Sequence, residues 1–221
     1  MIEIKNLTKF YKTKKGKHYI FKDLNIVIPE DKSIALIGRN GAGKSTLMRL
    51  IGGIDLPNYG SIRTNKTISW PVGLSGGFQG SLTGRDNVKF VSRLYCKENE
   101  IAEKINYVEQ FSELGNYFDM PIKTYSSGMK SRLSFGLSMA FNFDYYLVDE
   151  VTAVGDAAFK KKCSDIFHEK TISSKFIMVS HSLSSLRKYC DHAIYIGPNS
   201  SVQLYEDIDE AIHFHKIDQG V

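Results

Sequence analysis

A glycine-rich segment near the start of the chain has the residue types and spacing of a phosphate-binding loop. Residues 38–45 read GRNGAGKS, which fits the pattern GxxxxGK followed by Ser or Thr, between an apolar run and a helical pattern. Glycines let backbone N–H groups turn toward phosphate oxygens, and the start of a helix adds partial positive charge. The lysine reaches the terminal phosphates, and the serine hydroxyl binds Mg²⁺. We therefore predict a nucleoside triphosphate site formed by Gly38, Asn40, Gly41, Gly43, Lys44, Ser45 and Thr46, with Lys44 also catalytic.

An apolar segment that ends in two acidic residues supplies the partner that such a loop needs. Residues 145–150 read YYLVDE. In this kind of site, a carboxylate at the end of a strand holds Mg²⁺, and a neighbouring acid can activate the attacking water. A strand that ends in solvated acids would look the same, but the phosphate-binding loop favours the functional interpretation. We predict that Asp149 and Ser45 bind the metal and that Glu150 is the general base.

Strand and helix patterns alternate along the chain and would position these motifs. Residues 1–31 alternate apolar and polar side chains and predict short antiparallel strands around a lysine-rich turn. Residues 33–38 predict a buried strand, and the apolar spacing after Lys44 predicts a helix that ends at a glycine pair. From about Asp144 strand patterns return, as YYLV, KFIMVS, AIYI and SVQLY, before a short helix at 211–217.

The middle third of the chain predicts helices rather than strands. Val88, Val91 and Leu94 are expected on one helix face, and the apolar residues of 101–111 lie opposite a charged face. Strands that alternate with helices indicate an α/β fold. We predict a P-loop NTPase core of RecA-like type with a mostly parallel sheet, an N-terminal antiparallel β subdomain and a helical insertion.

Length and composition are compatible with one compact domain. The chain has 221 residues, of which 42% are hydrophobic, and its apolar runs are far shorter than the roughly 20 residues that span a bilayer. A soluble protein is expected. The net charge of +5 and the lysine clusters fit a solvated surface as well as a polyanionic partner, so they do not discriminate between these two interpretations. The three cysteines lack CxxC spacing, which favours reduced thiols.

Together these motifs resemble the ATP-binding cassette (ABC) ATPases, over essentially the whole chain. In that family a signature motif lies shortly before the Mg²⁺-binding aspartate and begins a helix that faces the nucleotide of a second protomer. The letters LSGG at 74–77 lie too far from Asp149 and lead into a poor helix start. The segment YSSGM at 125–129 lies closer and precedes a helical pattern. The resemblance therefore implies a degenerate signature in which Ser126 and Gly128 contact the partner's nucleotide.

Four more site residues are implied by the resemblance. Gln79 corresponds to the glutamine that contacts Mg²⁺ and the lytic water, and His181 to the histidine that contacts the γ-phosphate. Asp156 corresponds to the loop that crosses the dimer interface, and Tyr11 to the aromatic residue that stacks on adenine. Each residue alone would also suit an ordinary loop, strand end or strand surface. Beside the other motifs, we favour the functional interpretation.

The resemblance also implies cofactors and partners. ATP and Mg²⁺ are expected, as are an ATP-dependent homodimer and a separate transmembrane permease subunit. The segments SWPVGLSGGFQGSLTGRDNVKF, YFDMPIKTYSSGMKSRLSFGLSMAF and DYYLVDEVTAVGD resemble the ATPase subunit of capsular polysaccharide exporters of Gram-negative bacteria. The chain is then expected to power capsular polysaccharide export, as a peripheral protein on the cytoplasmic side of the inner membrane, together with the polysaccharide export machinery.

Alternative functions remain within the same family. An ATPase of a teichoic acid or O-antigen exporter is one, and a soluble ABC ATPase acting on nucleic acid or the ribosome is another. The chain offers no room for the second cassette or long coiled coils of the soluble class, so no nucleic-acid partner is expected. We expect one ABC ATPase domain over residues 1–221, with a helical subdomain over approximately 80–134.

Overall fold

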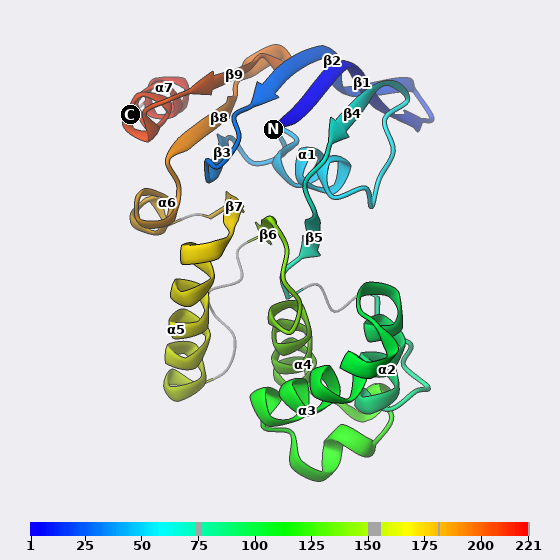
Figure 1. The fold of residues 1–221 in the computed structure, drawn as a ribbon. Helices are drawn as coiled ribbons and strands as arrows, with labels where there is room; N and C mark the ends of the chain where they lie inside the picture. Colours follow the sequence, from blue (N-terminus) through cyan, green and yellow to red (C-terminus); the bar gives the residue numbers. More distant parts are fainter. Residues whose placement is uncertain (74–76, 150–155, 181, 221) are drawn as a thin grey trace. The chain divides into compact units, whose positions relative to one another are not determined.

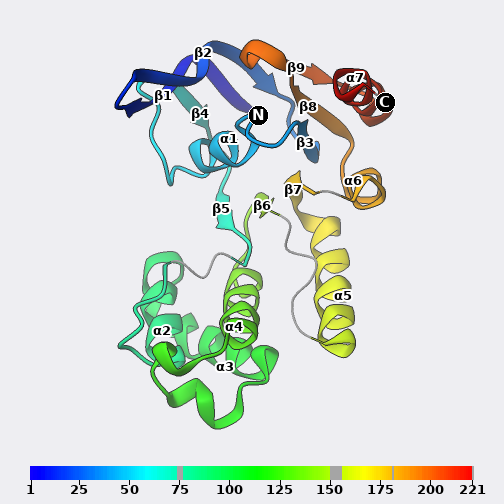
Figure 2. The same ribbon diagram turned by 180° about the vertical axis from the view of Figure 1, so that it is seen from behind.

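The computed structural model describes the chain except for residues 74–76, 150–155, 181 and 221. Its elements, labelled in Figure 1 and seen from behind in Figure 2, form two compact units. The first unit consists of Met1–Pro71, Phe143–Glu150 and Thr171–Val221, and the second of Val72–Asn142 and Val151–Lys170. The helical subdomain predicted over 80–134 falls within the second unit.

Three strands form an antiparallel sheet in the first unit. Strands β1 (Ile2–Thr13) and β2 (Gly16–Ile28) pair as predicted, although each is long rather than short. On its other edge β1 pairs with β4 (Tyr59–Thr64), so the order is β2-β1-β4. Strand β4 was not predicted, because none of its six residues is fully buried and its sequence carries no clear apolar alternation.

A six-stranded sheet forms the rest of the core and has the order β5-β6-β7-β3-β8-β9. Four of its five strand pairs are parallel, and only the pair of β8 and β9 is antiparallel within the described residues. This arrangement confirms the predicted α/β fold with a mostly parallel sheet. The strands are β3 (Ile34–Gly38), β5 (Ile68–Pro71), β6 (Tyr145–Asp149), β7 (Lys175–Val179), β8 (His192–Ile196) and β9 (Val202–Tyr205). The short β5 escaped prediction because it has only four residues, one of them a proline.

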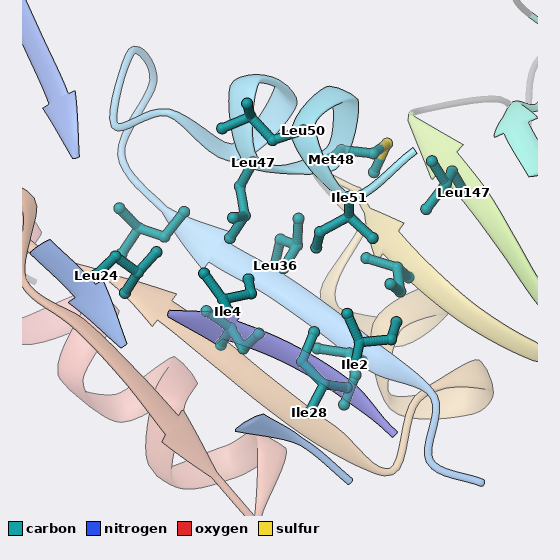
Figure 3. Packing of buried hydrophobic residues seen from close by; sticks show 14 of the residues in the cluster. Ile2, Ile4, Leu24, Ile28, Leu36, Leu47, Met48, Leu50, Ile51 and Leu147 are labelled. Carbon is teal, nitrogen blue, oxygen red and sulfur yellow. The ribbon is translucent and has the colours of Figure 1, made fainter. Parts of the chain in front are cut away.

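Helix α1 (Lys44–Ile51) is held by a core between the two sheets. Figure 3 shows Leu47, Met48 and Ile51 packed toward residues of both sheets, such as Ile4 and Leu36. A helix of eight residues is too short to persist alone in water. Each buried leucine or isoleucine stabilises the fold by about 1.5–3 kcal/mol, so this core fixes the helix and the loop before it.

Helices make up most of the second unit. They are α2 (Gly84–Tyr95), α3 (Ile101–Ser112), α4 (Ser127–Met139) and α5 (Ala157–Ser173), whose last residues belong to the first unit. Val88 is buried, but Leu94 is 65% exposed, so the predicted apolar face of α2 was wrong at that end. Each step of three residues along an α-helix falls about 60° short of a full turn around the helix axis. Leu94 is two such steps after Val88, so it points about 120° away from Val88.

Two helices complete the first unit. They are α6 (Leu183–Tyr189) and α7 (Ile208–Gln219), and α7 is longer than the helix predicted at 211–217. Within the described ranges, no helix is both long and apolar enough to cross a bilayer.

Candidate functional site

The carboxyl ends of neighbouring parallel strands place the predicted phosphate loop beside the predicted metal ligand. Strand β3 is buried throughout, lies between β7 and β8, and ends at Gly38. Strand β6 pairs with β7, where Asp149 lies opposite Val179. Because parallel strands end at the same edge of a sheet, ligands of α/β proteins bind at this edge.

The loop between β3 and α1 has a backbone that suits glycine. Gly41 and Gly43 have φ angles of 80° and 109°, a region that other residues rarely adopt. A Cβ at Gly43 would lie 2.6 Å from Cγ2 of Ile20. Gly43 is also the N-cap of α1, where no described side chain caps the helix and the first turn has no acid. The start of α1 thus offers the positive end of a helix to an anion.

Substitution of Gly43 by alanine should therefore weaken nucleotide binding. The new Cβ would both strain the backbone and collide with Ile20, so the loop must move and its N–H groups would lose their alignment. The control is Gly53→Ala at the far end of α1, where φ is also positive but the space around a Cβ is open. In a titration with a fluorescent ATP analogue, Gly43→Ala should raise the dissociation constant about tenfold or more, whereas Gly53→Ala should leave it unchanged. Equal losses in both variants would contradict this role.

The Lys44 ammonium lies over the loop. Its Nζ donates hydrogen bonds to the carbonyl oxygens of Gly38 at 2.7 Å and Arg39 at 3.0 Å. These carbonyls hold the positive charge next to the start of α1. The loop thus presents a lysine charge and a helix N-terminus on one surface, which is the arrangement that binds terminal phosphates.

A cavity of about 540 Å³ opens on this loop. Its size is within the usual range for small-molecule sites. The lining residues are Ile20, Asn40, Gly41, Gly43, Lys44, Ser45, Thr46, Asp149 and Val179. The structure thus brings together most of the residues predicted for the phosphate loop and the predicted metal ligand Asp149. Ile20 from β2 forms an apolar wall that was not predicted, because an isoleucine in a strand has no distinguishing pattern.

Two oxygen ligands in this cavity fit Mg²⁺. The Ser45 hydroxyl and the Asp149 carboxylate both line it. Mg²⁺ prefers oxygen ligands and usually keeps several waters, so one carboxylate and one hydroxyl are sufficient beside the phosphates of a nucleotide. Among the residues that the structure describes, no group of three or more His, Cys, Asp and Glu side chains could hold a metal by itself.

Tyr11 lies elsewhere on the first unit. Its hydroxyl donates to Oδ2 of Asp55 at 3.1 Å and accepts from Arg49 at 3.4 Å. Arg49 lies in the last turn of α1 and Asp55 follows that helix, so both partners lie at the end of α1 opposite to the phosphate loop. Among the described residues, Tyr11 does not line the cavity, so its role at adenine stays a prediction.

A histidine of the last helix lies behind the loop. A second cavity of about 340 Å³ is lined by Gly38 and Lys44 on one side and by Ile212 and His215 of α7 on the other. Burial lowers the pKa of His215, and the charge of Lys44 lowers it further. The imidazole is therefore held neutral near the loop, which avoids a second cation beside Lys44.

The segment with Gln79 is anchored through its backbone in the second unit. The Gln79 N–H donates to Oδ1 of Asn87 at 2.8 Å, and Nδ2 of Asn87 donates to the Gln79 carbonyl at 3.2 Å. Asn87 is nearly buried in α2, whereas the Gln79 side chain is exposed. Asn87 thus fixes the backbone of Gln79, while the exposed side chain is accessible to a ligand. Sequence reasoning missed Asn87, which has no motif of its own.

Helix α4 begins at the predicted signature. Ser126 is its N-cap, and the Ser126 Oγ accepts a hydrogen bond from the Met129 N–H at 3.2 Å. Ser126, Ser127 and Gly128 are exposed, and the first turn contains no acid. The helix that follows residues 74–77 starts only at Gly84, capped by Thr83. The exposed start of α4 can therefore receive an anion.

Asp156 lies at the start of α5. Its Oδ1 accepts a hydrogen bond from the Phe159 N–H at 2.9 Å, and its Oδ2 lies 2.8 Å from Arg132. The Phe159 amide, helped by the charge of Arg132, lowers the pKa of Asp156. The carboxylate is thus ionised and oriented. The predicted catalytic residues Glu150 and His181 lie outside the described residues.

Comparisons with known proteins agree with this geometry. The family model described as ABC transporter matches residues 21–153. The chain is 66% identical to the polysialic acid transport ATP-binding protein KpsT of Escherichia coli, over 100% of this chain and 99% of the relative. It is 44% identical to the capsule polysaccharide export ATP-binding protein CtrD of Neisseria meningitidis, over 97% and 98% of the two chains.

The fold also matches a solved structure. This is a dimeric ATP-binding cassette in a post-hydrolysis state with bound ADP and Pi, with a TM-score of 0.72. The match covers 88% of this chain and 94% of the other at 22% identity, so it shows the fold alone.

Proposed function

Because the chain belongs to the ABC transporter family, we propose that it is the ATP-hydrolysing subunit that powers export of a capsular polysaccharide. The observation that carries this proposal is the near full-length identity with ATP-binding proteins of polysialic acid and capsule polysaccharide export. The cavity on the phosphate loop supports the ATPase activity independently. Relatives named for teichoic acid and O-antigen export are more distant, which favours the capsule class.

Each predicted site residue would have its own role in ATP hydrolysis. The Lys44 ammonium and the N–H groups of α1 would hold the terminal phosphates, and Ser45 and Asp149 would hold Mg²⁺. The family resemblance implies that Gln79 would also contact the metal. The metal supplies positive charge that neutralises the charge on the β- and γ-phosphate oxygens. Glu150 would take a proton from the attacking water, and His181 would hydrogen-bond the γ-phosphate. Tyr11 would stack on the adenine.

A second protomer would complete the site. Exposed N–H groups at the start of α4, with Ser126 and Gly128, suit the γ-phosphate bound by the partner. Asp156 would lie at the same interface. The dimeric cassette with the same fold supports a homodimer. In this arrangement ATP lies between the two copies, and its hydrolysis lets them separate.

Partners and location follow from the export function. We propose a separate transmembrane permease subunit that contacts the second unit near Gln79, and a position on the cytoplasmic side of the inner membrane. The two protomers would pass the closing and opening movement to the permease. The wider polysaccharide export machinery would then receive the polymer. No observation favours a nucleic-acid partner.

Replacement of Lys44 by alanine in the native bacterium tests the export function. Loss of the lysine charge should prevent productive ATP binding, so surface polysaccharide should fall and polymer should accumulate inside the cell. Lys14→Ala, in the turn between β1 and β2, is the matched control and should export normally. Polymer outside and inside the cells would be quantified with a glycan-specific probe. Normal surface polymer in the Lys44→Ala strain would contradict the export function.

A further inference from the structure

Arg132 of α4 forms an ionic cluster in the second unit that the sequence analysis did not assign. One guanidinium nitrogen lies 3.1 Å from Oε2 of Glu113, and another lies 2.8 Å from Oδ2 of Asp156. The guanidinium also lies 4.3 Å from the ring centroid of Phe159. The Arg132 side chain is only 19% exposed, although Asp156 is 64% exposed. Arg132 is therefore held on three sides while it reaches a surface carboxylate.

Both oxygens of the Asp156 carboxylate are used by described groups. Oδ1 caps α5 through the Phe159 N–H, and Oδ2 accepts from Arg132. The cap ties the carboxylate to α5, and the ion pair ties it to α4. Its direction is thus set by two helices, and Arg132 supplies the link to α4.

The same helix carries the predicted signature. Ser126 caps α4, and Arg132 follows about 9 Å further along the helix axis. A helix is stiff over this length, so the exposed start of α4 and the Asp156 carboxylate cannot shift independently while the ion pair is intact. Both groups are proposed above to meet the partner protomer.

We propose that Arg132 is a positioning residue that joins the start of α4 and Asp156 into one rigid interface element. This inference rests on the proposed two-protomer site. The partner's nucleotide would then meet Ser126, Gly128 and Asp156 in a fixed arrangement. Loss of Arg132 would leave each group present but allow them to move apart, so the dimer would form less readily.

Lys162 offers a matched control within the same cluster. Its ammonium binds Oε1 of Glu113 at 2.7 Å and the Phe111 carbonyl at 3.0 Å. It also lies near the rings of Phe111 and Phe159. Lys162→Gln thus removes a cation and an ion pair to Glu113 but keeps the link between Arg132 and Asp156. A purely structural role for the cluster predicts similar losses from Lys162→Gln and Arg132→Gln.

The experiment measures ATPase rate against protein concentration at saturating ATP. The concentration that gives half-maximal specific activity reports how readily the active dimer forms. Arg132→Gln should raise this concentration about tenfold. The ATP affinity of the monomer and the melting temperature should be the same in Arg132→Gln as in Lys162→Gln. Arg132→Lys, which keeps the charge but not the forked contact, should recover part of the effect.

A double substitution separates coupling from independent damage. If Arg132 acts through Asp156, Arg132→Gln combined with Asp156→Asn should be no worse than Asp156→Asn alone. Additive losses, or equal behaviour of Arg132→Gln and Lys162→Gln, would overturn the inference and leave the proposed ATPase intact. The wild-type protein provides a further test. If its ATPase rate per protomer stays constant when the protein is diluted until only monomers remain, the two-protomer site is overturned, and this inference with it.

Discussion

Replacement of Glu150 by glutamine should slow ATP hydrolysis by roughly 10² to 10⁴ while ATP still binds. The amide keeps the size of the side chain but cannot accept the proton of the attacking water. Asp149, the preceding residue, lines the cavity beside Ser45, so β6 ends at the cavity on the phosphate loop. Binding depends on the loop and α1, which the substitution leaves unchanged. Phosphate release under single-turnover conditions would give the rate, and a fluorescent ATP analogue would give the affinity.

The control for this experiment makes the same chemical change elsewhere. Glu206 is exposed between β9 and α7, so Glu206→Gln should hydrolyse ATP at the wild-type rate. A slow Glu150→Gln enzyme that still binds ATP is expected to accumulate as an ATP-bound dimer, visible by sedimentation. Wild-type turnover in Glu150→Gln would remove this residue from the role of general base.

Replacement of Ser126 by arginine should abolish hydrolysis while each protomer still binds ATP. Ser126, Ser127 and Gly128 at the start of α4 are small and exposed, which leaves room for the phosphate proposed to bind there. A long side chain at the N-cap would occupy the place of that phosphate in the site to which Ser126 contributes. Ser126→Ala is the control, since it removes the hydrogen bond to the Met129 N–H and costs about 1 kcal/mol without adding bulk. Full ATPase activity in Ser126→Arg would contradict the signature assignment.

Mixing two inactive variants tests the trans arrangement directly. In a dimer of Ser126→Arg with Lys44→Ala, the intact phosphate loop of the first protomer faces the intact Ser126 of the second. Half of the dimers in an equal mixture have this composition, and each has one complete site of two. Activity should therefore return to about a quarter of the wild-type level by the symmetry of the dimer. Two folded variants that stay inactive together would contradict a site shared in this way.

Local patterns in the sequence determined the chemistry and the class of fold. The phosphate loop, the apolar strand before it and the helix after it are contiguous, and each follows from the conformations that glycine, apolar runs and helical spacing favour. The same holds for the YYLVDE segment and for the strands that return after it, because their apolar residues are buried in one sheet. The start of α4 was also readable, since a serine cap precedes a long helical pattern.

Only the tertiary structure decided which distant residues meet. Ile20 forms a wall of the cavity because β2 passes Gly43, and Tyr11 binds Asp55 because α1 brings that residue back to β1. Arg132 meets Glu113 and Asp156, which lie far from it on either side in sequence, through the packing of α3, α4 and α5. Such contacts depend on long-range packing, which leaves no periodic signal in the residues that make them. Sequence thus determines what each segment can do, and packing determines which segments act together.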